Sequence, residues 1–148
     1  MTSTVVGTTD KETVRRLVVP TGIITFALAA LLSVTNADSA TEAVVEVVIQ
    51  AAVAAAIFGL VVPRALRRES AGGRGLIMSV IGLLLVMPAF WSGLPLLLGA
   101  AGALVGQAGR HAERGSGKAI AALVIGLLAV VAYAAVYVLD YLHTHGIG

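Results

Sequence analysis

Three polar residues inside otherwise apolar segments have the clearest capacity for chemistry in this sequence. Glu46 and Gln50 lie four residues apart in one apolar run, and Tyr133 lies in another. Together with Glu42, the first two form a stripe on one helix face. A carboxylate within a membrane costs free energy unless it is paired, protonated or hydrated. The pattern indicates either a proton or cation site at Glu46, Gln50 and Tyr133, or a Glu46 carboxylate that reaches the water interface.

A second group of possible ligands stands at the end of the sequence. Asp140, His143 and His145 supply oxygen and nitrogen donors of the kind that bind zinc, nickel or copper. A metal centre would need a further anchor, for which Glu42 or Glu46 are the candidates. We expect a solvated external tail over residues 141–148 and no bound metal or cofactor.

Other kinds of chemistry find no support in the sequence. The chain has no cysteine, which excludes disulfides and thiolate chemistry. The glycine-rich loop before Lys118 fails the spacing of a phosphate-binding loop, because Ala112 stands where the first glycine is required. No aromatic or basic motif indicates nucleic-acid binding. We therefore expect a protein that is not an enzyme.

Composition indicates the elements that position these residues. The 148 residues are 58% hydrophobic and 12% charged, which is typical of a chain that has lipid as its solvent. Residues 17–35, 43–63 and 119–140 are long enough to cross the bilayer as helices, and residues 1–16 form a cytoplasmic tail. Ser39 and Glu42 have the spacing of a capping box at the start of the second span. The prediction is one all-α integral membrane domain over residues 1–148.

The uncharged segment between the second and last spans must break. As one helix, residues 76–109 would be about 50 Å long, well beyond the thickness of a bilayer. The string PAFWSGLP supplies a proline kink, a turn and a proline suited to a helix start. We expect a short helical hairpin over residues 75–91 and 94–109. The count is then about five transmembrane helices, or three with a re-entrant pair.

The charges predict the orientation. With five passes, all ten lysines and arginines fall on one side of the membrane together with four acidic residues, whereas the other side carries four acidic residues and no cation. By the positive-inside rule, the N-terminus is cytoplasmic and the C-terminus external. The basic face is expected to contact anionic lipids, and the protein to lie in the cell (inner or plasma) membrane.

Small residues recur at helical spacing along the spans. In lipid, close backbone approach along such stripes is a main source of helix association. The stripes predict tight packing within the monomer, or contacts in a homo-oligomer or larger membrane assembly. They comprise Ala51, Ala55 and Gly59, then Gly75, Ser79 and Gly82, then Gly99, Gly102, Gly106 and Gly109, with Gly126 in the last span.

Aromatic residues at the ends of the spans predict an interfacial belt. Tyr137 and Tyr141 in the last span and Trp91 in the hairpin turn are expected at the membrane surface. Tyr133 lies deeper, and its hydroxyl needs a partner, for which Glu46 and Gln50 are the candidates.

One internal repeat accompanies these patterns. The string VIGLL occurs at residues 80–84 and again at 124–128, each time in a helix that follows a basic, glycine-rich loop. From Gly73 to about Val138, the order of basic loop, glycine-rich helix, proline turn, helix, basic loop and helix resembles small Gly-rich multi-pass membrane domains of unknown function in high-G+C Gram-positive bacteria. The resemblance implies a bacterial inner-membrane protein, but no reaction and no functional residue.

Two functions remain after these observations. The first is a non-enzymatic membrane protein that packs its helices with one another or serves as an accessory subunit, for which Glu46→Gln is expected to be tolerated. The alternative is a small transporter or channel with a polar site at Glu46, Gln50 and Tyr133, in which the same substitution abolishes activity.

Overall fold

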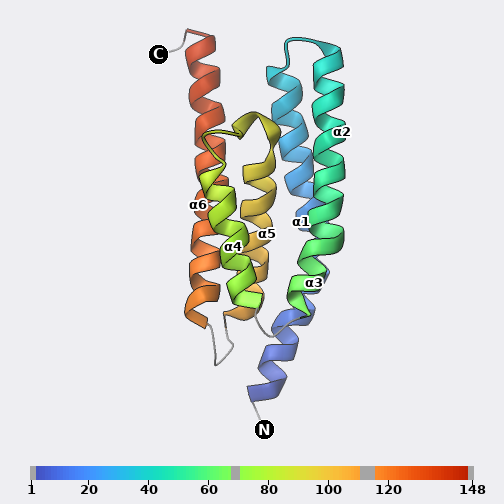
Figure 1. The fold of residues 1–148 in the computed structure, drawn as a ribbon, viewed down its shortest axis with the longest axis vertical. Helices are drawn as coiled ribbons and strands as arrows, with labels where there is room; N and C mark the ends of the chain where they lie inside the picture. The colour runs from blue at the N-terminus through green and yellow to red at the C-terminus, as the bar shows by residue number, and fades with distance from the viewer. Residues whose placement is uncertain (1–2, 68–70, 111–115, 147–148) are drawn as a thin grey trace.

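The chain folds into antiparallel helices, and the predicted all-α class is confirmed. The computed structural model describes residues 3–67, 71–110 and 116–146, with side chains from Glu12 onward, and these residues form no strand. Successive long elements run in alternating directions (Figure 1). In order they are α1 (Ser3–Asn36), α2 (Ala40–Ala56), the π-helical η1 (Ile57–Val61), α3 (Val62–Leu66), α4 (Ala71–Leu84), the 3₁₀ turn η2 (Phe90–Ser92), α5 (Leu94–Gly109) and α6 (Ser116–Thr144).

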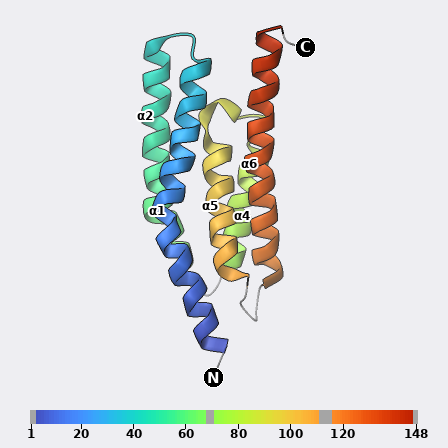
Figure 2. The ribbon, with the colours of Figure 1, turned by 180° about the vertical axis from the view of Figure 1, so that it is seen from behind.

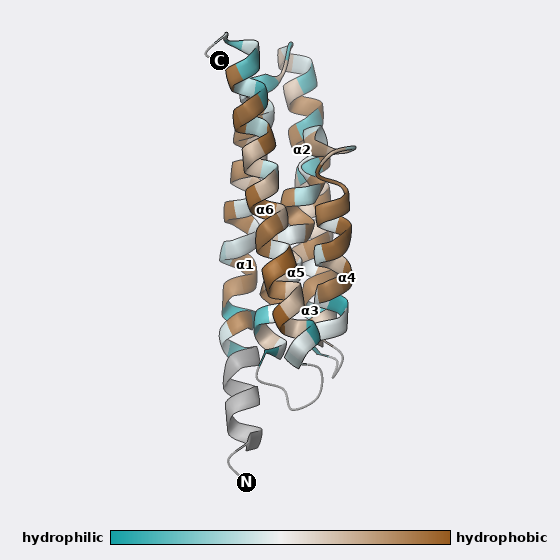
Figure 3. Ribbon diagram, turned by 90° about the vertical axis from the view of Figure 1, so that its left-hand side faces the viewer, coloured by the Kyte–Doolittle hydropathy of each residue, from teal (hydrophilic) through white to brown (hydrophobic). Residues whose placement is uncertain are grey.

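Three of the described helical stretches are long and apolar enough to cross a membrane. They are Glu12–Asn36 with 25 residues, Ala40–Leu66 with 27 and Ser116–Thr144 with 29. Hydrophobic residues occupy the middle of the bundle, and hydrophilic residues gather toward its two ends (Figure 3). The helix of α1 begins at Ser3, so most of the segment assigned to a cytoplasmic tail is helical and continuous with the first span.

The second long stretch continues through Pro63, where we expected it to close. Proline has no N–H to donate to the carbonyl four residues earlier, and its ring crowds that carbonyl. The helix accommodates Pro63 with the π-helical segment η1, in which the Val62 N–H reaches the Ile57 carbonyl five residues back. The Arg64 side chain then donates to the Leu60 carbonyl at 3.2 Å. The stretch therefore ends at Leu66, three residues past the predicted boundary.

Two shorter helices, α4 and α5, flank the turn that contains Pro88, and α4 ends before residue 91, the predicted end of that helix. α4 ends at Leu84, four residues before Pro88, because the proline ring would meet the carbonyl at that position. The turn satisfies much of its own backbone: the Ala89 N–H donates to Leu85 at 3.0 Å, and the Ser92 hydroxyl donates to Ala89 at 2.6 Å. Gly93 closes the turn with φ at 69°, a conformation that favours glycine.

Glycine lets α4, α5 and α6 meet backbone to backbone. A methyl group added at Gly82 would stand 2.8 Å from the Gly99 nitrogen, and one at Gly126 would stand 2.5 Å from the Gly99 carbonyl oxygen. Gly82 and Gly126 are equivalent positions of the repeated VIGLL string, so the two copies approach α5 at the same residue. α5 is accordingly the most buried helix in the described chain.

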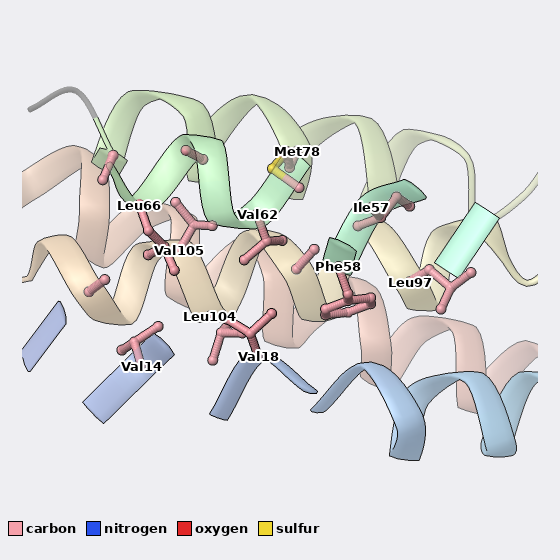
Figure 4. Packing of buried hydrophobic residues seen from close by; sticks show 14 of the residues in the cluster. Val14, Val18, Ile57, Phe58, Val62, Leu66, Met78, Leu97, Leu104 and Val105 are labelled. Carbon is pink, nitrogen blue, oxygen red and sulfur yellow. The ribbon is translucent and has the colours of Figure 1, made fainter. Parts of the chain in front are cut away.

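The α1–α2 hairpin packs against this group mainly through side chains. Seen from behind, α1 lies between α2 and α5 (Figure 2). Apolar side chains from both arms of the hairpin meet α5 in the largest apolar cluster (Figure 4). The contributors include Val14 and Val18 of α1, Phe58 of η1, Val62 of α3, and Leu97 and Leu104 of α5.

Candidate functional site

Buried polar side chains meet where the tip of the α4–α5 hairpin touches the long helices. The Gln50 amide nitrogen donates to the Ser33 hydroxyl at 2.6 Å, which joins α2 to α1. Both side chains are buried, and the Gln50 carbonyl oxygen has no hydrogen-bond partner among the described residues. A methyl group at Gly93 would stand 3.0 Å from the Gln50 amide nitrogen, so only glycine lets the tip approach this closely.

Two tyrosines of α6 extend this arrangement to the opposite side of the bundle. The Tyr137 hydroxyl lies near the hydroxyls of Ser33 and Tyr133. Tyr133 is 0% exposed, yet its hydroxyl makes no well-formed hydrogen bond within the described part of the chain. The rings of Tyr133 and Tyr137 are 4.9 Å apart, and Phe90 of η2 meets Tyr137 edge to face at 5.8 Å.

We call Ser33, Gln50, Tyr133 and Tyr137 the polar layer. It combines two donor–acceptor hydroxyls, an amide and a tyrosine hydroxyl with unused capacity, all held by three different helices. Such groups can bind and orient a small polar species or pass a proton, and they can equally fix the register of packed helices.

Glu46 lies at the edge of the polar layer. It is partly exposed, one turn from Gln50 on α2, and within electrostatic range of both Tyr133 and Tyr137. The structure thus brings the three predicted site residues into one region. The predicted hydrogen bond from Tyr133 to Gln50 or Glu46 does not form: the Gln50 amide nitrogen donates to Ser33, and the Gln50 carbonyl oxygen and the Tyr133 hydroxyl both lack a partner among the described residues.

The polar layer lies well away from the α1–α2 turn, toward the middle of the long helices. Gln50 is ten residues from Ala40, which corresponds to about 15 Å along α2. The hairpin tip ends at this depth, below the α1–α2 turn (Figure 1). Beside it, α1 and α6 border an apolar groove of about 410 Å³ that includes Leu28, Leu32, Tyr133 and Tyr137. The polar layer therefore borders apolar surface on its α1–α6 side.

The candidate metal ligands do not assemble. Among the described residues there is no group of three histidine, aspartate or glutamate side chains placed to hold one ion. His145 instead stacks on Tyr141 with ring centroids 4.1 Å apart, and its Nδ1 lies 2.9 Å from the Tyr141 carbonyl oxygen. Asp140 and His143 lie on the exposed end of α6.

The predicted packing glycines differ in what they meet. Gly99, Gly102, Gly106 and Gly109 of α5 all lie against neighbouring helices. At Gly102 an added methyl group would collide with the Ser79 hydroxyl, which itself donates to the Ala122 carbonyl at 2.6 Å. The stripe of Ala51, Ala55 and Gly59 is exposed, and nothing lies within 4 Å of a methyl group added at Gly59.

The predicted aromatic belt is wrong for one residue. Tyr137 is only 4% exposed, because Phe90 of the hairpin tip and the Tyr133 ring, one turn earlier on α6, both pack against it. Trp91 and Tyr141 are exposed, at 57% and 46%. Ser39 caps α2 as its spacing predicts, since its side chain accepts the Glu42 N–H at 3.2 Å.

Cations gather at the end of the bundle opposite the α1–α2 turn. They include Arg15 in the N-terminal half of α1, Arg67 after α3, Arg74 in the first turn of α4, Arg110 after α5 and Lys118 in the first turn of α6. The alternating helix directions bring all these positions to one end. Arg68, Glu69, His111, Glu113 and Arg114 lie outside the described residues.

Sequence reasoning missed Ser33, Tyr137 and Gly93 as members of the polar layer. Ser33 gave a usable signal, because a serine deep in an apolar run needs a partner on a neighbouring helix. The signal for Gly93 was weaker, because the sequence indicated only that this glycine belongs to the turn between two helices.

Comparisons with known proteins do not identify the chain. No protein-family model matches it, and neither a curated protein nor a solved structure shows significant similarity. The resemblance to small Gly-rich multi-pass membrane domains of high-G+C Gram-positive bacteria stays a prediction.

Proposed function

We propose that this chain is a multi-pass protein of the cell membrane whose role is structural, as an accessory subunit that packs with itself or with a larger membrane assembly. The observation that carries the proposal is the contrast between its surface and its interior. The three long helices expose large apolar side chains along their length, including Ile23, Val48 and Val131, each more than 60% exposed. An apolar surface of this extent is suited to lipid or to other membrane helices.

The orientation proposed from the sequence is supported by the common end of the described cations. A basic end suits the cytoplasmic side, and Asp38, Glu42 and Asp140 at the other end suit the external side. The N-terminus is then cytoplasmic and the C-terminus external.

The hairpin is proposed as a short pair of helices that enters from the basic side. α4 and α5 are about 21 and 24 Å long at 1.5 Å per residue, less than the roughly 30 Å of hydrocarbon. The backbone hydrogen bonds within the turn favour a tip that ends inside the outer half of the bilayer. Of the two arrangements, these features favour three full spans with a re-entrant pair.

A structural role fits the interior of the bundle. Gly99 lies between Gly82 of α4 and Gly126 of α6, and Gly106 lies against the backbone of α6. Contacts of this kind fill the space between α4, α5 and α6 with main chain, which holds the group together without a polar pathway through it.

A second candidate, a small transporter or channel, is favoured by the polar layer. Two buried atoms, the Gln50 carbonyl oxygen and the Tyr133 hydroxyl, have unused hydrogen-bonding capacity close to Glu46. Unsatisfied groups of this kind are costly in an apolar environment, and a transient proton or cation is one species that could use them.

Reconstitution separates the two functions. The protein is purified in detergent, inserted into liposomes and tested for proton and potassium flux under an imposed potential, beside Glu46→Gln and Tyr133→Phe. The structural role predicts flux equal to that of empty liposomes in all three preparations. The transporter would be established instead if the wild type shows flux and both substitutions abolish it while the variants stay folded.

Membrane placement is tested separately. Expressed protein is expected to stay in the membrane fraction through an alkaline carbonate wash and to be released only by detergent. Release by carbonate alone would refute placement in the bilayer.

A further inference from the structure

An elongated groove separates α1 from the second long stretch at the basic end of the bundle. Its lower part has a volume of about 570 Å³, with Arg15 of α1 and Arg67 after α3 at its borders. Its walls are formed by Val18, Phe58 and Leu66. Figure 4 shows Val18 and Phe58 projecting toward the shared core from these two elements. The groove thus combines two cations with an apolar lining.

The groove continues along the two helices toward their middle. A second hollow of about 430 Å³ shares Val19, Phe58 and Gly59 with the first and extends to Ala51. From Arg67 to Ala51 is sixteen residues, or about 24 Å of helix. Half of the hydrocarbon core is about 15 Å thick, so the groove is long enough to follow a lipid chain through one leaflet.

Small side chains keep this groove open. Ala51, Ala55 and Gly59 form the exposed stripe of α2 and η1, and a methyl group at Gly59 would meet nothing within 4 Å. Across from them, Gly22 lies under the Phe58 ring, where an added methyl group would stand 2.9 Å from the ring. The helices therefore touch at Phe58 and leave space on the outer side of that contact.

The charges at the basic end of the groove favour a ligand with a phosphate group. Arg15 and Arg67 are exposed and border the groove from opposite helices. Glu12 also borders it, but the Arg16 guanidinium lies 3.7 Å from the Glu12 carboxylate and offsets its charge. Guanidinium groups bind phosphate through paired hydrogen bonds. A second copy of the chain in the same groove would bring like charges together.

We propose that this groove is a binding site for one anionic phospholipid, with the phosphate between Arg15 and Arg67 and an acyl chain along Phe58, Gly59 and Ala51. The site rests on the proposed membrane placement. It goes beyond a general attraction of the basic face for anionic lipid, because it assigns one lipid to two named arginines and one apolar path.

Native mass spectrometry tests the site on the full chain. The detergent-purified, delipidated protein is titrated with phosphatidylglycerol and with phosphatidylcholine that carries the same acyl chains. We expect one phosphatidylglycerol to bind at least about tenfold more tightly than phosphatidylcholine. The double variant Arg15→Gln/Arg67→Gln is expected to remove this preference.

Two matched variants distinguish the site from surface electrostatics. Arg74→Gln/Lys118→Gln removes the same charge from the same end of the bundle but outside the groove, and is expected to keep the preference. Gly59→Leu fills the open space with a side chain and is expected to weaken the binding of both lipids. An equal loss in the two double variants would overturn the proposal, because the preference would then reflect net charge alone.

The competing occupant gives a different result. If the groove receives a second copy, Gly59→Cys forms a disulfide-linked dimer in membranes, and this outcome would overturn the lipid assignment. Failure of the lipid site leaves the carbonate-wash result unchanged, so it is distinguishable from failure of the proposed membrane placement.

Discussion

The α4–α5–α6 group and the α1–α2 hairpin are held together by different means. The first packs backbone against backbone through glycine, and its one buried serine on α4, Ser79, is fully used in a hydrogen bond to α6. The second packs through side chains, and both grooves described above, the one beside Tyr133 and the elongated one beside Phe58, border α1. Backbone contacts leave no space to fill, whereas side-chain contacts leave hollows between them. The comparison indicates a rigid unit to which a more loosely fitted hairpin is attached.

The largest expected effect comes from adding one methyl group to the glycine-packed group. Gly102→Ala would place a carbon against Ser79, whose position is fixed by its hydrogen bond to Ala122. We expect it to lower the free energy of unfolding in detergent by about 1 to 3 kcal/mol. Denaturation followed by circular dichroism measures the change.

Gly59→Ala is the matched control for that substitution. It adds the same group to a helical glycine with open space around it, and helix propensity favours alanine, so we expect no loss of stability or a small gain. Equal losses from the two substitutions would contradict the distinction between the two regions.

A smaller effect is expected in the polar layer. Ser33→Ala removes the partner of the Gln50 amide and leaves that amide buried and unpaired, which should cost about 1 kcal/mol. The double variant Ser33→Ala/Gln50→Leu removes both polar groups and should recover most of the loss. The same denaturation assay measures both, and a double variant less stable than the single one would show that Gln50 stabilises the fold by another contact.

The smallest effect separates the two buried tyrosines. Tyr137→Phe loses a hydroxyl that lies near the Ser33 hydroxyl and should reduce stability by about 0.5 kcal/mol. Tyr133→Phe removes a hydroxyl without a well-formed hydrogen bond and should leave stability unchanged or raise it. Thermal unfolding of the two variants in one detergent checks the order, and the reverse order would mean that Tyr133 has a partner in the folded protein.

Local patterns in the sequence predicted much of the fold. The lengths of the apolar runs predicted the three long helical stretches. The helix predicted over residues 94–109 has those bounds in the structure. Prolines were harder to interpret, because the two prolines have different effects. The helix α4 ends before Pro88, whereas the helix before Pro63 continues through a wider, π-helical segment. Which outcome occurs depends on whether neighbouring helices continue to hold the segment, and that is not a local property.

The candidate site was predictable only in part. Glu46, Gln50 and Tyr133 were singled out because polar groups are rare in apolar runs, and they do lie in one region. The partner of Gln50 and the burial of Tyr137 depend on how α1 and the hairpin tip fit against α2 and α6. Spacing within one helix carries no information about that fit, and it likewise could not tell that the Ala51–Gly59 stripe faces outward.

The central claim is that the bundle crosses the membrane with its basic end in the cytoplasm. The chain has no cysteine, so single cysteines can be introduced at Thr41, in the first turn of α2, and at Gly117, where a methyl group meets nothing within 4 Å. Intact cells are treated with a membrane-impermeant maleimide, before and after permeabilisation. The account predicts that Thr41→Cys reacts in intact cells and Gly117→Cys only after permeabilisation. The opposite pattern, or reaction of both in intact cells, would contradict it.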